Sequence, residues 1–325
     1  MRNRLPARCA DINTPYCPCV LADTNQCVYC SQLKGEAVCN CNWSGVCILN
    51  EKNWQSKSIR KSNDENPYVF RTEITAPILE YKLIADNTYY LLLKLSSDLA
   101  YDLDRPGAFV FIRRNCDPDI FKFPVGVMHV DQEHVGLVVE TIGPKSSQIL
   151  KHNGSLVVRA PYYNGILGGP WIDKLSEGKV VLLAGGLGQP PAVPIAKTLL
   201  AHGNRITVIL APGKTGKVFV AEVIAHDNAR IITVNSMRSE GLALLREMLT
   251  IPEELPDLIV SAGPDEQHFG IASLLQNIDI ELPMAATNNA TMCCGEGVCG
   301  SCDKESNTGS KVRTCKTQTD FLNFI

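Results

Sequence analysis

The sequence has no apolar run long enough to cross a membrane and no excess of charge of one sign. Its net charge is −3, with acidic and basic residues mixed along the chain, which gives no basis for binding nucleic acid or an anionic membrane. Residues 1–8 lack the apolar core of a secretory signal. These absences predict a soluble, cytoplasmic protein with neither a nucleic-acid nor a membrane partner.

Cysteine is almost missing from the middle of the chain. Of the 14 cysteines, eight lie from Cys9 to Cys47 and five from Cys293 to Cys315, so that Cys116 stands alone between the two groups. In a reducing compartment, clustered cysteines are more often metal ligands than disulfides. The sequence therefore predicts a middle that folds around ordinary apolar cores, flanked by two metal-dependent ends.

The C-terminal cysteines follow a C-x4-C-x2-C…C pattern, which is the ligand spacing of a plant-type [2Fe–2S] cluster. The four predicted ligands are Cys294, Cys299, Cys302 and Cys315. Four thiolates must converge from one tightly wound loop, and the loop contains glycines that can supply positive φ angles, namely Gly295, Gly297 and Gly300. Zinc is the main competitor, but zinc ribbons use two short knuckles instead of this spacing. We therefore predict a [2Fe–2S] segment over residues 289–325.

The N-terminal cysteines predict a second, small metal-binding module over residues 1–50, followed by a polar linker over 51–66. The module has too few apolar residues for a core of its own, so metal binding would supply its folding energy. Its tentative ligands form knuckle-like pairs: Cys17, Cys19, Cys27, Cys30, Cys39 and Cys41. The spacing does not choose between zinc and an additional iron–sulfur cluster.

Two core-driven domains are predicted between the cysteine groups. Residues 67–172 contain short apolar or alternating runs separated by turn residues, which is typical of an antiparallel β-barrel. In residues 173–288 strand and helix patterns alternate, which predicts a doubly wound α/β domain. A glycine-rich turn, residues 185–188, follows the first buried strand there. Alone it indicates either a phosphate-binding turn or simply a tight one.

The order of barrel, α/β domain and cysteine loop resembles the electron-transfer subunit of dihydroorotate dehydrogenase, within the ferredoxin–NADP+ reductase superfamily. The related sulfide dehydrogenase and sulfhydrogenase γ subunits are similar too. The resemblance covers about residues 68–318. Six segments carry it: Arg105-Pro-Gly-Ala-Phe-Val, Ile142-Gly-Pro-Lys-Ser, Ala160-Pro-Tyr-Tyr-Asn-Gly, Ala184-Gly-Gly-Leu-Gly-Gln-Pro-Pro, Ser261-Ala-Gly-Pro and Met292-Cys-Cys-Gly-Glu-Gly-Val-Cys-Gly-Ser-Cys.

The resemblance implies FAD on the barrel, NAD(P)H on the α/β domain and electron transfer through the [2Fe–2S] cluster to or from a partner, a catalytic or electron-accepting flavoprotein or iron–sulfur subunit. It places Gly143, Lys145 and Ser146 at the FAD pyrophosphate and Asn164 and Gly165 near the flavin. Gly185, Gly186 and Gly188 would line the nicotinamide nucleotide. Ser261, Gly263 and Pro264 would lie at its nicotinamide end.

Three positions depart from the family pattern. Where the family carries Arg-Pro-x-Ser on a barrel strand, this chain has Phe123-Pro-Val-Gly126, and the nicotinamide-side Cys-Gly-Pro appears with Ala262 in the first place. Arg113 or Arg114 could replace the missing arginine. These departures keep open a second interpretation, a non-enzymatic electron-relay or scaffold subunit with a degenerate flavin site. Lys214 and Lys217 could meet a 2′-phosphate or be solvated, so the sequence does not choose between NADH and NADPH.

Overall fold

A computed structural model of the chain describes residues 5, 8–11, 14–16, 70–151, 153–307, 309 and 311–325. The predicted linker lies outside the described residues, as does most of the predicted N-terminal module. All six tentative N-terminal metal ligands, Cys17, Cys19, Cys27, Cys30, Cys39 and Cys41, are outside them too.

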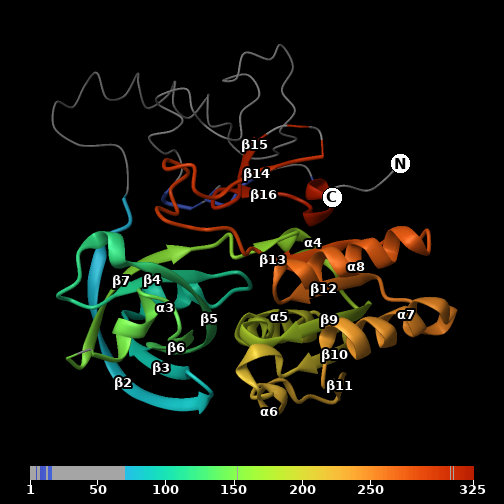
Figure 1. Cartoon of the computed structure of the whole chain (residues 1–325), viewed down its shortest axis with the longest axis horizontal. Helices are drawn as coiled ribbons and strands as arrows, with labels where there is room; N and C mark the ends of the chain where they lie inside the picture. The colour runs from blue at the N-terminus through green and yellow to red at the C-terminus, as the bar shows by residue number, and fades with distance from the viewer. Residues whose placement is uncertain are drawn as a thin grey trace.

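The first domain is a closed antiparallel barrel with the strand order β2-β3-β6-β5-β4-β7 (Figure 1). Its strands are β2 (Glu73–Ala85), β3 (Thr88–Lys94), β4 (Phe109–Arg113), β5 (Phe123–Asp131), β6 (His134–Glu140) and β7 (Ser155–Tyr162). Helix α3 (Ser97–Leu103) and the 3-10 turns η2 (Asp119–Phe121) and η3 (Ser146–Lys151) connect them. The long strand β2 pairs with β7 through its first half and with β3 through its second half, which closes the barrel.

The second domain is a six-stranded sheet with the order β11-β10-β9-β12-β13-β8. Five strands are parallel: β9 (Lys179–Gly185), β10 (Arg205–Ala211), β11 (Ala229–Thr233), β12 (Leu258–Ala262) and β13 (Met284–Thr287). The edge strand β8 (Ile166–Leu167) is antiparallel to β13. The helices are α4 (Gly169–Lys174), α5 (Gln189–Ala201), α6 (Ala221–Ile224), α7 (Leu242–Thr250) and α8 (Asp265–Asn277). Short helical turns are η4 (Gly186–Gly188), η5 (Gly213–Thr215), η6 (Met237–Gly241) and η7 (Pro252–Glu254).

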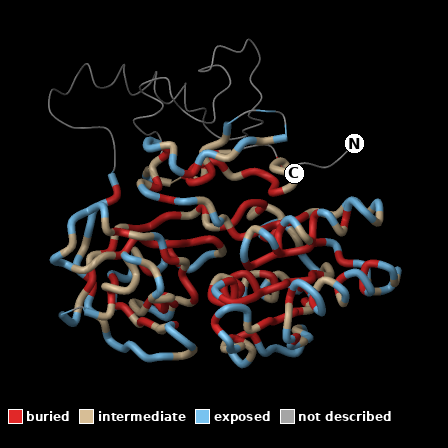
Figure 2. Tube along the Cα trace, viewed as in Figure 1, coloured by how far each residue is buried: buried red, intermediate tan, exposed pale blue. Residues whose placement is uncertain are grey.

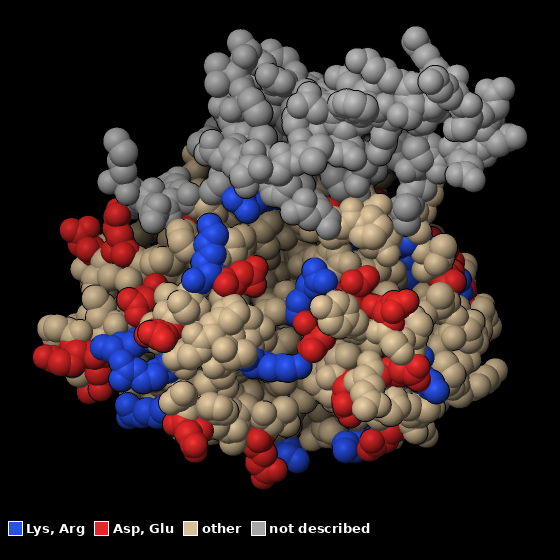
Figure 3. Space-filling model, turned by 180° about the vertical axis from the view of Figure 1, so that it is seen from behind, with Lys and Arg blue, Asp and Glu red and all other residues tan. Residues whose placement is uncertain are grey.

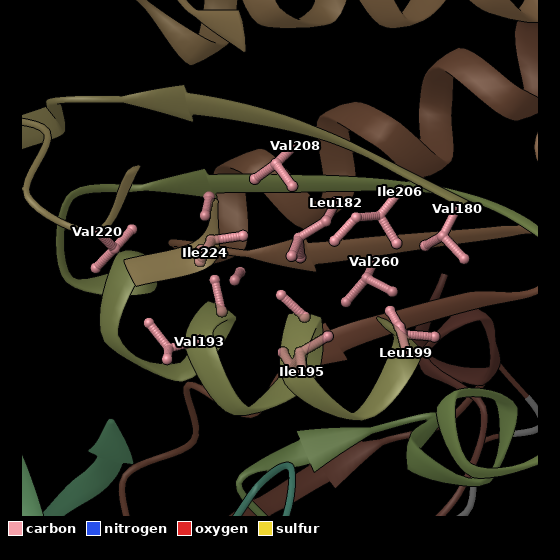
Figure 4. Close-up of a cluster of buried hydrophobic side chains, with 14 of the residues drawn as sticks. Val180, Leu182, Val193, Ile195, Leu199, Ile206, Val208, Val220, Ile224 and Val260 are labelled. Carbon is pink, nitrogen blue, oxygen red and sulfur yellow. The ribbon is translucent and has the colours of Figure 1, made fainter. Parts of the chain in front are cut away.

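Both faces of this sheet are covered, as its continuous apolar strands require. In β9, Val180 and Leu182 pack toward α5 and α6, whereas Val181 and Leu183 pack toward α7 and α8. Figure 4 shows the first of these layers, in which side chains of α5 meet those of β9, β10 and β12. The predicted combination of an antiparallel barrel and a doubly wound α/β domain is therefore confirmed.

The barrel and the sheet share an apolar core. Met128 of β5 and Val138 of β6 belong to the same buried cluster as Ile195 and Leu199 of α5. Helix α5 therefore lies between the barrel and the sheet and fixes one against the other (Figure 1). Figure 2 shows buried residues running through both domains.

The C-terminal segment lies across one end of both domains (Figure 1). It contains the hairpin of β14 (Asp303–Glu305) and β15 (Lys311–Arg313), then β16 (Thr317–Gln318) and the turn η8 (Phe321–Phe324). Strand β16 pairs with β1 (Arg8–Cys9), so the two ends of the chain meet here. None of the helices in the described part of the chain has both the length and the apolar character needed to cross a membrane.

Candidate functional site

The parallel sheet has a topological switch point at β9. Strand β10 lies on one side of β9 and β12 lies on the other. The chain segments that leave β9 and β12 at their carboxyl ends therefore run to opposite sides of the sheet. Open α/β sheets bind ligands in the crevice formed at such a point. The glycine-rich turn after β9 and the Gly263-Pro264 turn after β12 both lie at this edge.

Two glycines of the turn after β9 are required by their surroundings. Gly186 has φ of +54°, a conformation that side chains rarely adopt. A Cβ on Gly188 would lie 2.0 Å from the carbonyl oxygen of Ala262 at the end of β12. The turn is therefore pressed against the neighbouring strand, with the start of α5 directly behind it.

A cavity of about 1230 Å³ extends from this crevice to the barrel. Small-molecule sites usually measure roughly 300–1,000 Å³, so this cavity is larger than a typical site for one ligand. Its barrel wall is largely apolar, with Phe109, Phe123, Val125 and Val138. Its α/β wall is formed by the loops that follow β9 through β13.

Most of the predicted cofactor-binding residues line this cavity: Ser146, Gly165, Gly185, Gly186, Gly188, Gly263 and Pro264. Gly143 and Lys145 lie beside it without lining it. The Gly143 N–H donates to Ser146 Oγ at 3.1 Å, and Lys145 Nζ donates to the carbonyl oxygen of Lys122 at 3.2 Å. The cavity thus unites residues from both predicted nucleotide sites.

Asn164 and Ser261 do not line the cavity. Asn164 is fully buried, and its amide donates to the carbonyl oxygen of Thr317 at 2.9 Å and to that of Thr314. It therefore ties the barrel to the C-terminal segment. Ser261 is also fully buried, and its hydroxyl lies 2.7 Å from His268 Nδ1.

The three departures from the family pattern all occur at or next to this cavity. Phe123 and Gly126 line its barrel wall, and Ala262 is buried directly before Gly263. Neither candidate replacement arginine reaches it. Arg113 pairs with Glu73 at 2.5 Å and Arg114 with Asp117 at 2.5 Å, and both arginines lie outside the lining. The barrel wall therefore presents an apolar slot, the acidic Glu140 and the Ser146 hydroxyl, without a cation, to an FAD.

Cations in the cavity lining come from the α/β side. Lys214 follows β10 and Arg238 follows β11, and both line the cavity, whereas Lys217 does not. They lie beside the glycine turn, where a dinucleotide phosphate would bind. On the molecular face seen in Figure 3, acidic and basic side chains are interspersed without a continuous patch of either sign.

A buried histidine network, which sequence patterns did not single out, supports the Gly263 turn. His268 Nδ1 meets Ser261 Oγ, and His268 Nε2 lies 3.1 Å from both Thr287 Oγ1 and Asn289 Nδ2. Thr287 in turn donates to the Gly263 carbonyl oxygen at 3.1 Å, and Asn289 donates to the same oxygen at 2.7 Å. Burial lowers the pKa of His268 from 6.5 to about 4, so the ring is neutral at physiological pH.

We expect this histidine to make stability depend on pH. Above pH 6.5 the ring is neutral in both the folded and the unfolded chain. Between pH 6.5 and about 4 only the unfolded chain binds the proton. The free energy of unfolding therefore decreases as the pH is lowered, by on the order of 3 kcal/mol in total. Denaturant unfolding between pH 7.5 and 4.5 measures this loss. His268→Gln should flatten that part of the profile, and substitution of the exposed His226 should leave it unchanged.

The cysteine loop winds as predicted. Gly295, Gly297 and Gly300 have φ of +69°, +71° and +74°. Gly295 also allows close packing, because a Cβ there would lie 2.5 Å from the Tyr162 ring. Two backbone N–H groups point at sulfurs: Glu296 donates to Cys294 Sγ at 3.3 Å and Cys315 to Cys302 Sγ at 3.5 Å.

The four predicted ligands interact with one another through their side chains. Hydrogen bonding with the Cys315 thiol lowers the pKa of Cys294 to about 3 and that of Cys302 to about 7, and Cys294 also interacts with Cys299. The same bonds, with Cys294 and Cys302, raise the pKa of Cys315. In a two-iron cluster each iron takes two thiolates, so pairs of neighbouring thiols fit this group. Within the described residues, no group of three or more His, Cys, Asp or Glu side chains forms a site for a single metal ion.

The cavity and the cysteine loop meet at two residues. Phe109 and Met292 line the cavity, and both belong to a buried cluster with Phe111, Tyr162, Cys302 and Cys315. Phe109 and Tyr162 stack with their ring centroids 5.1 Å apart. One buried cluster therefore connects the end of the cavity with two of the four thiols.

Barrel, α/β domain and crevice together define the ferredoxin–NADP+ reductase type of fold. The chain resembles an NADH-dependent reduced ferredoxin–NADP oxidoreductase, studied for flavin-based electron bifurcation. The TM-score is 0.61 at 23% identity, over 75% of this chain and 87% of the other.

In sequence the chain is similar to dihydroorotate dehydrogenase B (NAD(+)) electron transfer subunits, which confirms the resemblance drawn from its motifs. The probable subunit of Methanothermobacter thermautotrophicus is 24% identical over 213 residues, 64% of this chain and 75% of the relative. That of Geobacillus kaustophilus is 24% identical over 231 residues, 69% of this chain and 86% of the relative. No model of a known protein family matches the chain.

Proposed function

We propose that this chain is the electron-transfer subunit of an NAD(P)H-dependent flavin iron–sulfur oxidoreductase, passing electrons between NAD(P)H, FAD and a [2Fe–2S] cluster and a partner subunit. The observation that carries the proposal is the junction at Phe109 and Met292. Both residues line the cavity and belong to the same buried cluster as Cys302 and Cys315. The relatives named as electron transfer subunits support the same reading.

The two walls of the cavity have separate tasks in this function. The apolar barrel wall, with Phe123 and Val125, would hold the flavin and exclude water, and Ser146 would donate to its pyrophosphate. The glycine turn after β9, with Lys214 and Arg238, would hold the nicotinamide nucleotide. When bound, the flavin takes a hydride and releases electrons singly. The chain itself would orient the nucleotide and the flavin, and hydride transfer between them needs no protein acid or base.

The partner would dock beside the cysteine loop. Val298 and Cys299 are exposed at this loop, with Val298 58% exposed, whereas Cys302 and Cys315 are buried. An acceptor that covers Val298 would contact the cysteine loop outside the cavity lining. We propose that this partner is a catalytic or electron-accepting flavoprotein or iron–sulfur subunit.

Diaphorase activity tests the flavin part of the proposal. Anaerobically purified protein reconstituted with FAD should reduce an artificial acceptor with NADH or NADPH, and either nucleotide should bleach the flavin. Arg238→Gln should raise KM for the preferred nucleotide roughly tenfold, as expected for one lost charge-assisted bond. FAD binding without reduction by either nucleotide would contradict the enzymatic reading.

Gly126→Ser is expected to tighten FAD binding. Nothing lies within 4 Å of the position that a Cβ would occupy at Gly126, so the hydroxyl can be added without steric cost. It would add a second hydroxyl donor, besides that of Ser146, to a wall that has no cation, which we expect to lower the FAD dissociation constant about fivefold. Titration of the apoprotein followed by flavin fluorescence measures the effect, with Gly126→Ala as the control that adds bulk alone.

The alternative function is an electron relay or scaffold without flavin chemistry. The cation-free barrel wall at Phe123 and Gly126 favours it. In that case the cysteine loop would still bind its cluster, but reconstitution would leave the protein without stoichiometric flavin. Iron content with no retained FAD would therefore support the relay.

A further inference from the structure

Four charged side chains from distant parts of the chain meet beside the cysteine loop. Arg71 Nη2 lies 2.6 Å from Asp11 Oδ1, and Arg71 Nη1 lies 3.0 Å from Glu296 Oε2. Lys316 Nζ lies 2.9 Å from the same Glu296 oxygen and also pairs with Asp11. Asp11, Arg71 and Lys316 are only 3%, 5% and 2% exposed. These three side chains are almost fully shielded from water, whereas the Glu296 side chain is 25% exposed.

Such a network is poorly explained by stability alone. Taking charges out of water is costly, and buried ion pairs are often no more stabilising than apolar residues of the same size. The Arg71 guanidinium is held in place further by the rings of Tyr16 and Tyr162, whose centroids lie 4.0 and 4.5 Å from its Cζ. These ring contacts fix the position of the Arg71 charge.

The network is part of the surroundings of the predicted cluster ligands. Lys316 directly follows Cys315, and the backbone of Glu296 donates to Cys294 Sγ. Tyr162 joins both groups, because its hydroxyl donates to Glu296 Oε1 at 3.1 Å while its ring packs in the cluster that contains Cys302 and Cys315. Charges this close to the thiols, and shielded from water, are weakly screened.

We propose that this buried network sets the reduction potential of the [2Fe–2S] cluster. The inference rests on the proposed function, since it needs the cluster at Cys294, Cys299, Cys302 and Cys315. Reduction adds one negative charge to the cluster, so the fixed cations Arg71 and Lys316 stabilise the reduced state and the carboxylates of Asp11 and Glu296 oppose it. Arg159, whose Nη2 lies 3.5 Å from Glu296 Oε1, adds a third cation at the border of the network.

Redox titration of the full-length holoprotein, followed by EPR of the reduced cluster, tests this inference. Lys316→Gln and Arg71→Gln each remove one positive charge and should lower the midpoint potential. Asp11→Asn and Glu296→Gln should raise it. The double variant Asp11→Asn/Lys316→Gln should return toward the parent value. A general loosening of the fold would instead shift the midpoint potentials of all four single variants in the same direction.

The exposed pair of Lys197 and Asp104, at 2.9 Å, provides matched controls. Lys197→Gln and Asp104→Asn should leave the potential unchanged. The inference is overturned if the cluster is present in the variants and the potentials do not move, or move with the same sign for acidic and basic substitutions. If one variant cannot retain iron, the opposite-sign partner and the double variant still decide the sign. Absence of iron from the parent protein would instead refute the proposed function.

Discussion

Replacing Cys294 with serine should remove the [2Fe–2S] cluster, whereas the same change at the adjacent Cys293 should leave it intact. Cys294 interacts with Cys315 and Cys299 and accepts the Glu296 N–H, while Cys293 is exposed. We expect Cys294→Ser to contain about two iron atoms and two acid-labile sulfides fewer per chain than the parent protein. The flavin should remain, because the barrel and the α/β domain have cores of their own.

The measurement is iron, sulfide and flavin content of anaerobically purified protein. Cys299→Ser is expected to behave like Cys294→Ser, and Cys116→Ser like Cys293→Ser. If Cys293→Ser removed the iron, or Cys294→Ser kept a normal spectrum, the assignment of ligands would be wrong.

Gly188→Ala should have the largest effect among substitutions in the cavity. Its Cβ would lie 2.0 Å from the Ala262 carbonyl oxygen and 2.6 Å from the Gly263 nitrogen, and backbone atoms at a strand end cannot easily yield. The variant must separate the start of α5 from the end of β12. We expect a loss of roughly 3 kcal/mol in the free energy of unfolding. Reduction by either nicotinamide nucleotide should disappear as well.

Denaturant unfolding and stopped-flow flavin reduction measure the two effects. Gly126→Ala is the control for stability, since nothing lies within 4 Å of its added methyl group. A Gly188→Ala protein with normal stability and normal nucleotide binding would show that the turn is not pressed against β12.

Local patterns carried most of what could be predicted from the sequence. The cysteine spacing and its glycines predicted the winding of the C-terminal loop, because a short loop is determined by its own residues. The apolar run at Val180 and the glycines after it predicted the strand, the turn and the helix that follow. These features need no knowledge of distant contacts.

Long-range contacts could not be predicted in this way. The placement of Asn164 near the flavin stays a prediction, and no sequence pattern indicated its bonds to the carbonyl oxygens of Thr314 and Thr317. The ion network joins Asp11, Arg71 and Lys316 across most of the chain, and no sequence period connects them. No sequence pattern distinguishes His268, which lies on α8. Its partners are apparent only from the packing of α8 against β12 and β13.

EPR spectroscopy can detect electron transfer from the nicotinamide nucleotide to the cluster directly. Anaerobic protein loaded with FAD is mixed with NADH or NADPH, and the EPR spectrum is recorded after freezing. The account predicts the signal of a reduced [2Fe–2S] cluster, which depends on FAD and is absent in Cys294→Ser. An iron-containing, FAD-loaded protein in which neither nucleotide produces this signal would contradict it.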